Sequence, residues 1–271
     1  MPELPEVETI TRSLRPALVG RTILAGQLLW KRSLAAPSAG KFQAGIAGQT
    51  VQEVTRRAKF IHLRLSASSL IVHLRMSGDL ALVPGKPVPG KHDRLLLFLS
   101  GDSTLVFSDA RKFGRIWLLS DPQELFARLG PEPLADDFTP DRLYRSLQAR
   151  RRQLKPLLLD QGFLAGLGNI YTDEALHTAG LHPLTSSDAV SPEQAGALWA
   201  AIRAVLAEGI RRNGASIDWV YRGGDFQNHF RVYGRTGEPC PECGTAIERL
   251  VIGQRGTHVC PQCQPLKEKI R

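Results

Sequence analysis

The 271-residue chain lacks any hydrophobic run near the roughly 18 residues that cross a membrane. Its first residues are acidic where a secretory signal would be basic and then apolar. It also contains no internal repeat and no low-complexity tract. These absences predict an intracellular protein with ordinary globular cores, and the length favours two domains.

Cysteine is absent before Cys240, so the chain has no disulfide framework of the kind found in small secreted proteins. The four cysteines form two Cys-x-x-Cys pairs, which are Cys240, Cys243, Cys260 and Cys263. Four thiolates at this spacing predict one closed, tetrahedral and structural zinc site.

Between the two pairs, segments 247–252 and 257–260 are expected to form a hairpin that turns at residues 253–256. Arg255 would then lie at an exposed tip. It would either contact a phosphate or be an incidental surface arginine, and both interpretations stay open.

Positive charge predominates, with 35 Lys and Arg against 26 Asp and Glu, which gives a net charge of +9. Such a chain favours a polyanionic partner such as nucleic acid, although a merely basic surface is the alternative. The same choice applies to a dense basic run, which comprises Arg142, Arg145, Arg150, Arg151, Arg152 and Lys155.

Short segments of alternating polarity dominate the first half and predict a β-sandwich or barrel up to about residue 130. The expected strands are 22–30, 51–57, 60–65, 70–76, 79–83, 95–99, 104–107 and 115–119. Residues 131–138 are expected to form a linker. Helices follow, with start signals at Thr139-Pro140 and at the capping box Ser191-Pro-Glu-Gln194, and with helical segments 154–159 and 169–179.

The N-terminal stretch Pro2-Glu-Leu-Pro-Glu-Val-Glu8 admits two interpretations. If Met1 is removed, Pro2 carries a terminal secondary amine that can form a Schiff base, with Glu3 and Glu6 as acid/base groups. Alternatively, the stretch only starts a helix, with Pro5 in its first turn and Gly20 after its end. That helix would bury one apolar face, formed by Val7, Ile10, Leu14 and Leu18.

Three further motifs each have a structural and a functional interpretation. In Asp109-Ala-Arg-Lys-Phe-Gly114, Arg111 and Phe113 could enter a base stack, or Phe113 could pack inward at a hairpin turn. In Gly166-Leu-Gly-Asn169, the helix N-terminus could hold a phosphate, or the glycines could make a tight turn. Met76 would by default be a core residue, and Lys59 a surface lysine.

Together these motifs resemble bacterial formamidopyrimidine-DNA glycosylase, in order and over essentially the whole chain. The residues that carry the resemblance lie in segments 2–9, 56–60, 73–78, 111–114, 166–171 and 232–235 and in the four cysteines. The resemblance implies an α+β fold: an N-terminal β-sandwich with an N-terminal helix (1–130), a helix–two-turn–helix region (139–225) and a zinc-finger hairpin (226–271). It also implies excision of oxidised purines from duplex DNA, with strand cleavage at the resulting abasic site.

The resemblance further implies roles for individual residues. Pro2 would be the nucleophile, Glu3, Glu6 and Lys59 would serve acid/base and ordering roles, and Arg255 would assist the second elimination. Met76, Arg111 and Phe113 would fill the space left by the flipped nucleotide. Further DNA contacts would come from His73, His92, Arg151, Asn169 and Tyr233. The family also implies a monomer acting in the cytoplasm at the nucleoid.

Two departures stand out. Ala110 occupies a position where the family usually has proline, and the lesion-reading loop at 215–225 looks short. The residues after Gln264 extend past the usual end, and no role is assigned to them. The alternatives are the sister enzyme for oxidised pyrimidines, endonuclease VIII, and a zinc-finger DNA-binding protein without activity.

Overall fold

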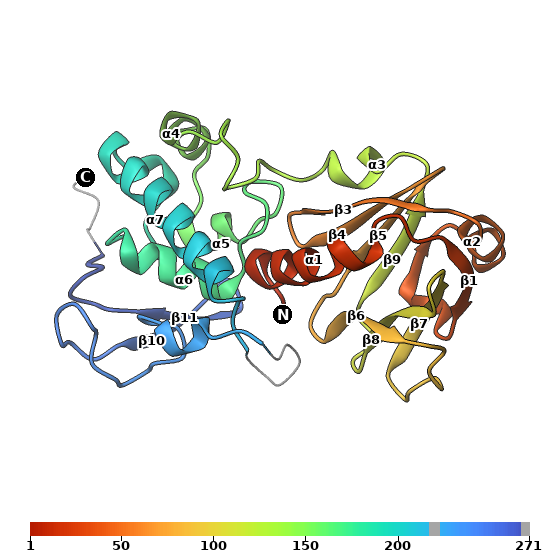
Figure 1. Ribbon diagram of the computed structural model, residues 1–271. Coiled ribbons are helices and arrows are strands. Elements are labelled where there is room, and N and C mark those ends of the chain that lie inside the picture. Colours follow the sequence, from red (N-terminus) through yellow and green to blue (C-terminus); the bar gives the residue numbers. More distant parts are fainter. Residues whose placement is uncertain (217–222, 267–271) are drawn as a thin grey trace. The chain divides into compact units, whose positions relative to one another are not determined.

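The computed structural model describes residues 1–216 and 223–266 (Figure 1). The chain divides into two compact units. The first is Met1–Ala127 with Ser216–Gly224, and the second is Arg128–Ala215 with Asp225–Arg271. Among the described residues, no helix is both long and apolar enough to cross a membrane.

The first unit begins with α1 (Leu4–Leu18), where Glu3 and Glu6 form the capping box and Pro5 lies in the first turn. The predicted apolar face is buried along the whole helix. Gly20 follows the helix with φ of +84°, a left-handed conformation that favours glycine. The expected start, face and end of this helix are therefore confirmed.

Two sheets follow, and the predicted β-sandwich is confirmed. One is antiparallel in the order β1-β7-β8-β6, made of β1 (Ile23–Leu28), β7 (Asp93–Leu99), β8 (Ser103–Asp109) and β6 (Gly78–Pro84). The other has the order β2-β9-β5-β4-β3, made of β2 (Leu34–Ala36), β9 (Arg115–Leu119), β5 (Ser69–His73), β4 (Phe60–Leu65) and β3 (Val51–Arg57). Apolar side chains of α1 and of both sheets share one core.

Two elements of this unit, β2 and α2 (Ala39–Ile46), were not predicted from the sequence. Strand β2 has only three residues, and α2 buries only Phe42 and Ile46, too few for a recognisable period. Helix α2 packs closely on β1. Gly26 of β1 leaves room for this approach, since an added Cβ atom there would lie only 2.9 Å from the Ile46 side chain. The short helix α3 (Gln123–Phe126) ends the sandwich portion.

The first part of the second unit is helical and contains α4 (Pro140–Gln148), α5 (Leu154–Leu158), α6 (Asn169–Thr178) and α7 (Pro192–Arg211). The Thr139 side chain caps α4, and Ser191 with Gln194 forms the predicted capping box of α7. Helices α6 and α7 cross closely, because a Cβ at Gly209 would lie 2.5 Å from the Tyr171 ring. The predicted helices of this unit are confirmed to within one or two residues.

The C-terminal hairpin is made of β10 (Glu248–Ile252) and β11 (Arg255–Val259) (Figure 1). Its turn is shorter than expected, because only Gly253 and Gln254 connect the strands, with φ of +55° and +62°. Two left-handed residues match the twist of a two-residue hairpin. Arg255 is therefore the first residue of β11, opposite Ile252, and is still exposed.

Candidate active site and nucleic-acid interface

The N-terminus of α1 places two carboxylates beside Pro2. Glu3 and Glu6 are each only 2 % exposed, and the Glu6 carboxylate accepts a hydrogen bond from the backbone N–H of Glu3 at 2.7 Å. Pro2 is also buried, and its nitrogen becomes an amine only once Met1 is removed. This geometry suits a terminal nucleophile with a proton-transfer group next to it.

Lys59 lies in the two-residue turn between β3 and β4 and is only 4 % exposed. The default expectation of a surface lysine is wrong. The preceding Ala58 has φ of +53°, and its carbonyl accepts a hydrogen bond from Arg56 Nη1 at 2.9 Å. Arg56 Nε also pairs with Glu8 at 2.9 Å, so the turn that carries Lys59 is tied to α1.

His73 ends β5 and lies opposite Phe60, the residue that follows Lys59. Burial, followed by the charges of Arg75 and Lys59, lowers the pKa of His73 to about 3. The Nδ1 atom accepts a hydrogen bond from the backbone N–H of Arg75 at 3.0 Å. These contacts assign the neutral tautomer with its proton on Nε2, which can donate to a phosphate oxygen.

The three residues expected to fill a vacated base stack lie on two turns of the sandwich. Met76 lies in the turn after β5, not within a strand, and is half-buried. Arg111 and Phe113 lie in the turn after β8, where Phe113 is 50 % exposed and Arg111 Cζ lies 5.1 Å from its ring centre. An inward-packed Phe113 is therefore excluded. His92, on a neighbouring turn, is exposed.

Helix α6 organises the expected phosphate contacts of the second unit. Asn169 is its first residue and donates from Nδ2 to the carbonyl of Gly256 in the hairpin at 2.9 Å. Asp173, one turn later, accepts a hydrogen bond from the backbone N–H of His258 on β11 at 3.0 Å. The helix therefore holds the hairpin that carries Arg255.

Glu174 and Asp173 are site residues that sequence reasoning missed. The Glu174 carboxylate accepts hydrogen bonds from three consecutive backbone N–H groups, those of Arg231, Val232 and Tyr233. The only signal in the sequence is an acidic pair that begins four residues after Asn169, the last residue of the Gly-Leu-Gly-Asn motif. Nothing in that pair reveals that one carboxylate binds the hairpin and the other binds the loop of Tyr233.

The basic run is less available to a polyanion than its charge indicates. Lys155 is fully buried and pairs with Asp173, so it does not belong to a surface. Three arginines of the run pair with nearby carboxylates, in the pairs Arg142–Asp137, Arg145–Asp141 and Arg152–Asp160. The Arg151 side chain is 78 % exposed, with its guanidinium 3.8 Å from Asp188.

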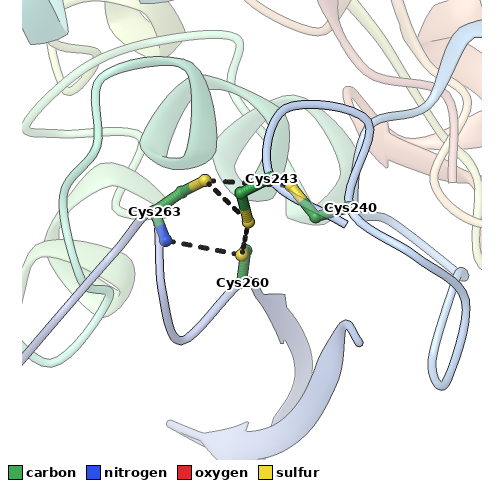
Figure 2. Close-up of side chains that lie close together, drawn as sticks. All are labelled: Cys240, Cys243, Cys260 and Cys263. Carbon is green, nitrogen blue, oxygen red and sulfur yellow. Dashed lines mark hydrogen bonds between the residues drawn. The ribbon is translucent and has the colours of Figure 1, made fainter. Parts of the chain in front are cut away.

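The four cysteine sulfurs converge from two loops of the zinc-finger hairpin (Figure 2). Three sulfur–sulfur distances are 3.5, 3.5 and 3.8 Å. Tetrahedral thiolates with Zn–S bonds of about 2.3 Å would lie about 3.8 Å apart. The side chains fit one zinc ion, which supports the predicted structural zinc and leaves no ligand position for a substrate.

Segment 215–225, which we expect to be a short lesion-reading loop, lies partly outside the described residues, and Trp219 and Tyr221 belong to that part. At its described base, Ser216 Oγ accepts hydrogen bonds from the backbone N–H groups of Gly223 and Gly224. At the chain's C-terminal side, Gln264 is buried and bonds to Cys260 and Leu181.

Comparison with known proteins covers all of these parts. The N-terminal domain of formamidopyrimidine-DNA glycosylase matches residues 1–116, its H2TH domain matches 129–220, and a zinc finger found in FPG and IleRS matches 237–266. The formamidopyrimidine-DNA glycosylase of Chloroflexus aurantiacus is 49 % identical over 97 % of this chain and 98 % of that protein. That of Chloroflexus aggregans is 48 % identical over 98 % and 99 %.

Solved structures agree. MutM in complex with DNA containing carbocyclic 8-oxo-G is 36 % identical, with a TM-score of 0.91 over 97 % of this chain and all of that chain. The Lactococcus lactis Fpg complex with abasic-site DNA is 35 % identical, with the same TM-score and coverage. This chain therefore belongs to the formamidopyrimidine-DNA glycosylase family, whose members are DNA glycosylases with AP lyase activity.

Proposed function

We propose that this chain excises oxidised purines, such as 8-oxoguanine and formamidopyrimidines, from duplex DNA through a Schiff base at Pro2. One observation carries the proposal. The Glu8–Arg56 ion pair, with Arg56 bound to the Ala58 carbonyl, ties the helix that follows Pro2 and Glu3 to the turn that carries Lys59. A nucleophile and two proton-transfer groups are thereby held on one scaffold, as covalent catalysis requires.

The reaction follows from these groups. The Pro2 nitrogen attacks C1′ of the damaged nucleotide, the bond from C1′ to the base breaks, and the base leaves as it gains a proton. The C1′–O4′ bond then breaks as O4′ takes up a proton, and the nitrogen forms an iminium with C1′. The iminium acidifies C2′, so that loss of a C2′ proton expels the 3′-phosphate. A second elimination releases the 5′-phosphate. We assign Glu3 and Lys59 to proton transfer, Glu6 to ordering the terminus, and Arg255 to the second elimination.

We assign the grip on the DNA backbone to His73, Lys59, Asn169, Tyr233 and Arg255, with His92 and Arg151 as outer contacts. The Nε2–H tautomer of His73 gives it a donor for a phosphate oxygen. Contacts of this kind carry no sequence information, which suits an enzyme that must act at any position. Binding should weaken steeply as salt concentration rises.

We assign Met76, Arg111 and Phe113 to the space left by the flipped nucleotide. Extruding a nucleotide costs a few kcal/mol, and side chains that fill the gap offset part of that cost. The Arg111 guanidinium can also hydrogen-bond the unpaired cytosine, which would favour lesions opposite cytosine.

Borohydride trapping on duplexes with 8-oxoguanine opposite cytosine tests the proposal. The wild-type protein should form a covalent adduct that maps to the N-terminal peptide. Pro2→Gly should lose base release and strand cleavage yet still bind damaged duplex. Pro89→Gly, the same change in an exposed loop, is the matched control and should behave as wild type.

Two other outcomes would overturn the proposal. An adduct only on a duplex with an oxidised pyrimidine would assign the chain to the substrate class of endonuclease VIII. No adduct on either duplex, with binding intact, would favour a DNA-binding protein without activity.

We also propose that the chain acts as a monomer at the nucleoid in the cytoplasm, where its substrate lies. Within it we assign catalysis to residues 1–130 together with Arg255, a linker to 131–138, and DNA binding to the region 139–225 and the hairpin 226–271.

A further inference from the structure

The two turns that carry Met76, Arg111 and Phe113 share an unusual backbone feature. Met76 follows Arg75, which has φ of +56°, and Phe113 follows Lys112, which has φ of +60°. Each left-handed residue with a side chain costs roughly 1–2 kcal/mol. Such conformations persist only where surrounding contacts enforce them, and they gather at functional sites.

Asp109, at the end of β8, supplies those contacts. Its side chain is buried, with only 1 % of the residue exposed. Its Oδ1 accepts hydrogen bonds from the Ser77 hydroxyl and, at 3.1 Å, from the backbone N–H of Arg111. Its Oδ2 accepts one from the backbone N–H of Gly114 at 2.6 Å. One carboxylate thus brackets the Arg111–Phe113 turn and joins it to Ser77, the residue after Met76.

Ser77 completes the link from the other side. Its Oγ accepts a hydrogen bond from the Arg111 N–H at 3.0 Å, so Ser77 contacts both Asp109 and the turn. The two turns are 32 residues apart in the sequence at this hydrogen bond between Ser77 and Asp109. They are nevertheless joined through buried polar groups, which bind most strongly when every partner is satisfied.

Neighbouring contacts keep the junction in place. Arg94 is buried and donates from Nε to the Asp109 carbonyl at 2.9 Å. A Cβ at Gly114 would lie 2.4 Å from the Phe107 ring, so the chain passes directly against the core. On the outer side, the Lys112 ammonium lies 4.4 Å from the centre of the Trp30 ring.

We propose that Asp109 is a positioning residue that controls the rate of lesion excision. It holds the Met76 turn and the Arg111–Phe113 turn together, so that the three gap-filling side chains form one preorganised wedge. This inference rests on the gap-filling role proposed above for the three side chains. A loose wedge would have to be ordered during extrusion, and that entropy would raise the barrier to base release. Strand cleavage at an abasic site that is already formed should depend less on the wedge, because a nucleotide without a base stacks poorly.

Asp109→Asn tests the inference, because it keeps the size of the side chain and one acceptor oxygen. Its amide would turn an N–H toward the N–H of Gly114, so the hydrogen bond that holds the end of the Arg111–Phe113 turn would be lost. We expect single-turnover excision of 8-oxoguanine opposite cytosine to fall at least roughly tenfold, or about 1.4 kcal/mol. Cleavage of a preformed abasic site should stay within about twofold, since this chemistry does not need the wedge.

Ser77→Ala removes only the hydrogen bonds that join the two turns. It should slow excision less than Asp109→Asn does, and cleavage of a preformed abasic site should again be nearly unchanged. It also keeps the inference testable if Asp109→Asn folds poorly. Asp93→Asn is the matched control, because Asp93 accepts hydrogen bonds from Gly90 N–H and Ser108 Oγ but contacts neither turn. That variant should leave both reactions unchanged.

Equal loss of both reactions in folded Asp109→Asn would overturn the inference, and so would full excision activity. Failure of the proposed function is a separate result, because it would show as the absence of a Pro2 adduct in the wild-type protein. Opposite-base preference gives a second measure. The rate ratio between duplexes with cytosine and with adenine opposite the lesion should narrow in Asp109→Asn, because Arg111 is no longer held.

Discussion

The carboxylate of Glu174, on α6, accepts a hydrogen bond from the backbone N–H of Tyr233 at 2.8 Å. Burial raises the pKa of Glu174, and the backbone donors of Tyr233, Arg231 and Val232 oppose that rise. Since α6 also begins with Asn169, one helix fixes two of the proposed phosphate contacts. The proposed phosphate contacts of this unit thus depend on a carboxylate that need not touch DNA.

Replacing Glu174 should therefore weaken DNA binding. Glu174→Ala leaves three backbone donors without their acceptor, and a hydrogen bond to a charged group contributes about 1.5–3 kcal/mol. We expect a lower melting temperature and a weaker Kd for duplex with an abasic-site analogue, with Glu174→Gln intermediate. Combined with Tyr233→Phe, the loss in binding should be less than additive. Glu193→Gln, at an exposed position on α7, is the control, and additive losses would contradict the coupling.

Protonation of His73 should destabilise the protein in mild acid. Folding lowers the pKa of His73 from 6.5 to about 3. Between these two pH values, His73 is therefore protonated in the unfolded chain but neutral in the folded chain. Stability from this group is complete above pH 6.5 and is lost as pH falls toward 3, by up to about 1.4 kcal/mol per pH unit.

Denaturant titrations from pH 7 to pH 4 measure this effect. His73→Asn can keep an acceptor for the Arg75 N–H but cannot titrate, so its stability should fall less steeply with pH. His92→Asn changes an exposed histidine and should keep the wild-type slope. Identical slopes in all three proteins would show that His73 titrates normally.

The parts of the fold that were predictable are those with local signals. Helix α1 can be recognised from its capping residues and apolar face. The zinc site can be recognised from four cysteines at fixed spacing. The buried polar links were not predictable, because they join distant segments. Lys155 looks like one more basic residue in a run, and only the packing of α5 beside α6 reveals its buried ion pair with Asp173.

The site residues divide in the same way. The motif around Lys59 marks the residue, but a strand pattern does not show that its turn is buried or that Arg56 holds it. Likewise, the sequence indicates Arg111 and Phe113 without indicating the carboxylate that fixes them. Motifs identify residues that touch a ligand, whereas positioning residues such as Asp109 and Glu174 become visible only through their hydrogen bonds.

Glu8→Gln should slow strand cleavage more than it weakens DNA binding, because Glu8 acts through Arg56 on the turn of Lys59. Burial raises the pKa of Glu8, but the Arg12 hydrogen bond and the charge of Arg56 outweigh it, and the net pKa is lowered. The stability contributed by Glu8 is therefore present above its ordinary pKa of 4.5 and is lost as pH falls through the lowered value.

Abasic-site cleavage and Kd, measured side by side, test this expectation. We expect a several-fold slower cleavage rate with Kd nearly unchanged. Glu53→Gln breaks an exposed ion pair with Arg64 on the same sheet and should change little. If Glu8 had a purely structural role, Glu8→Gln would instead lower the melting temperature and would change the cleavage rate and the Kd for DNA to a similar extent.

Removal of zinc should unfold the C-terminal hairpin while leaving the β-sandwich folded. In the described part of the chain, the buried apolar cluster around the site consists of Val232, Cys240, Ile247 and Cys260, with Cys263 packed against it. This cluster is too small to hold the hairpin without a metal. Metal analysis should find one zinc per chain, and Cys260→Ser should lose zinc and DNA binding together. Val251→Ser, at a position 70 % exposed on the same hairpin, should retain both. A zinc-free protein that binds damaged duplex with full affinity would show that the metal does not organise this surface.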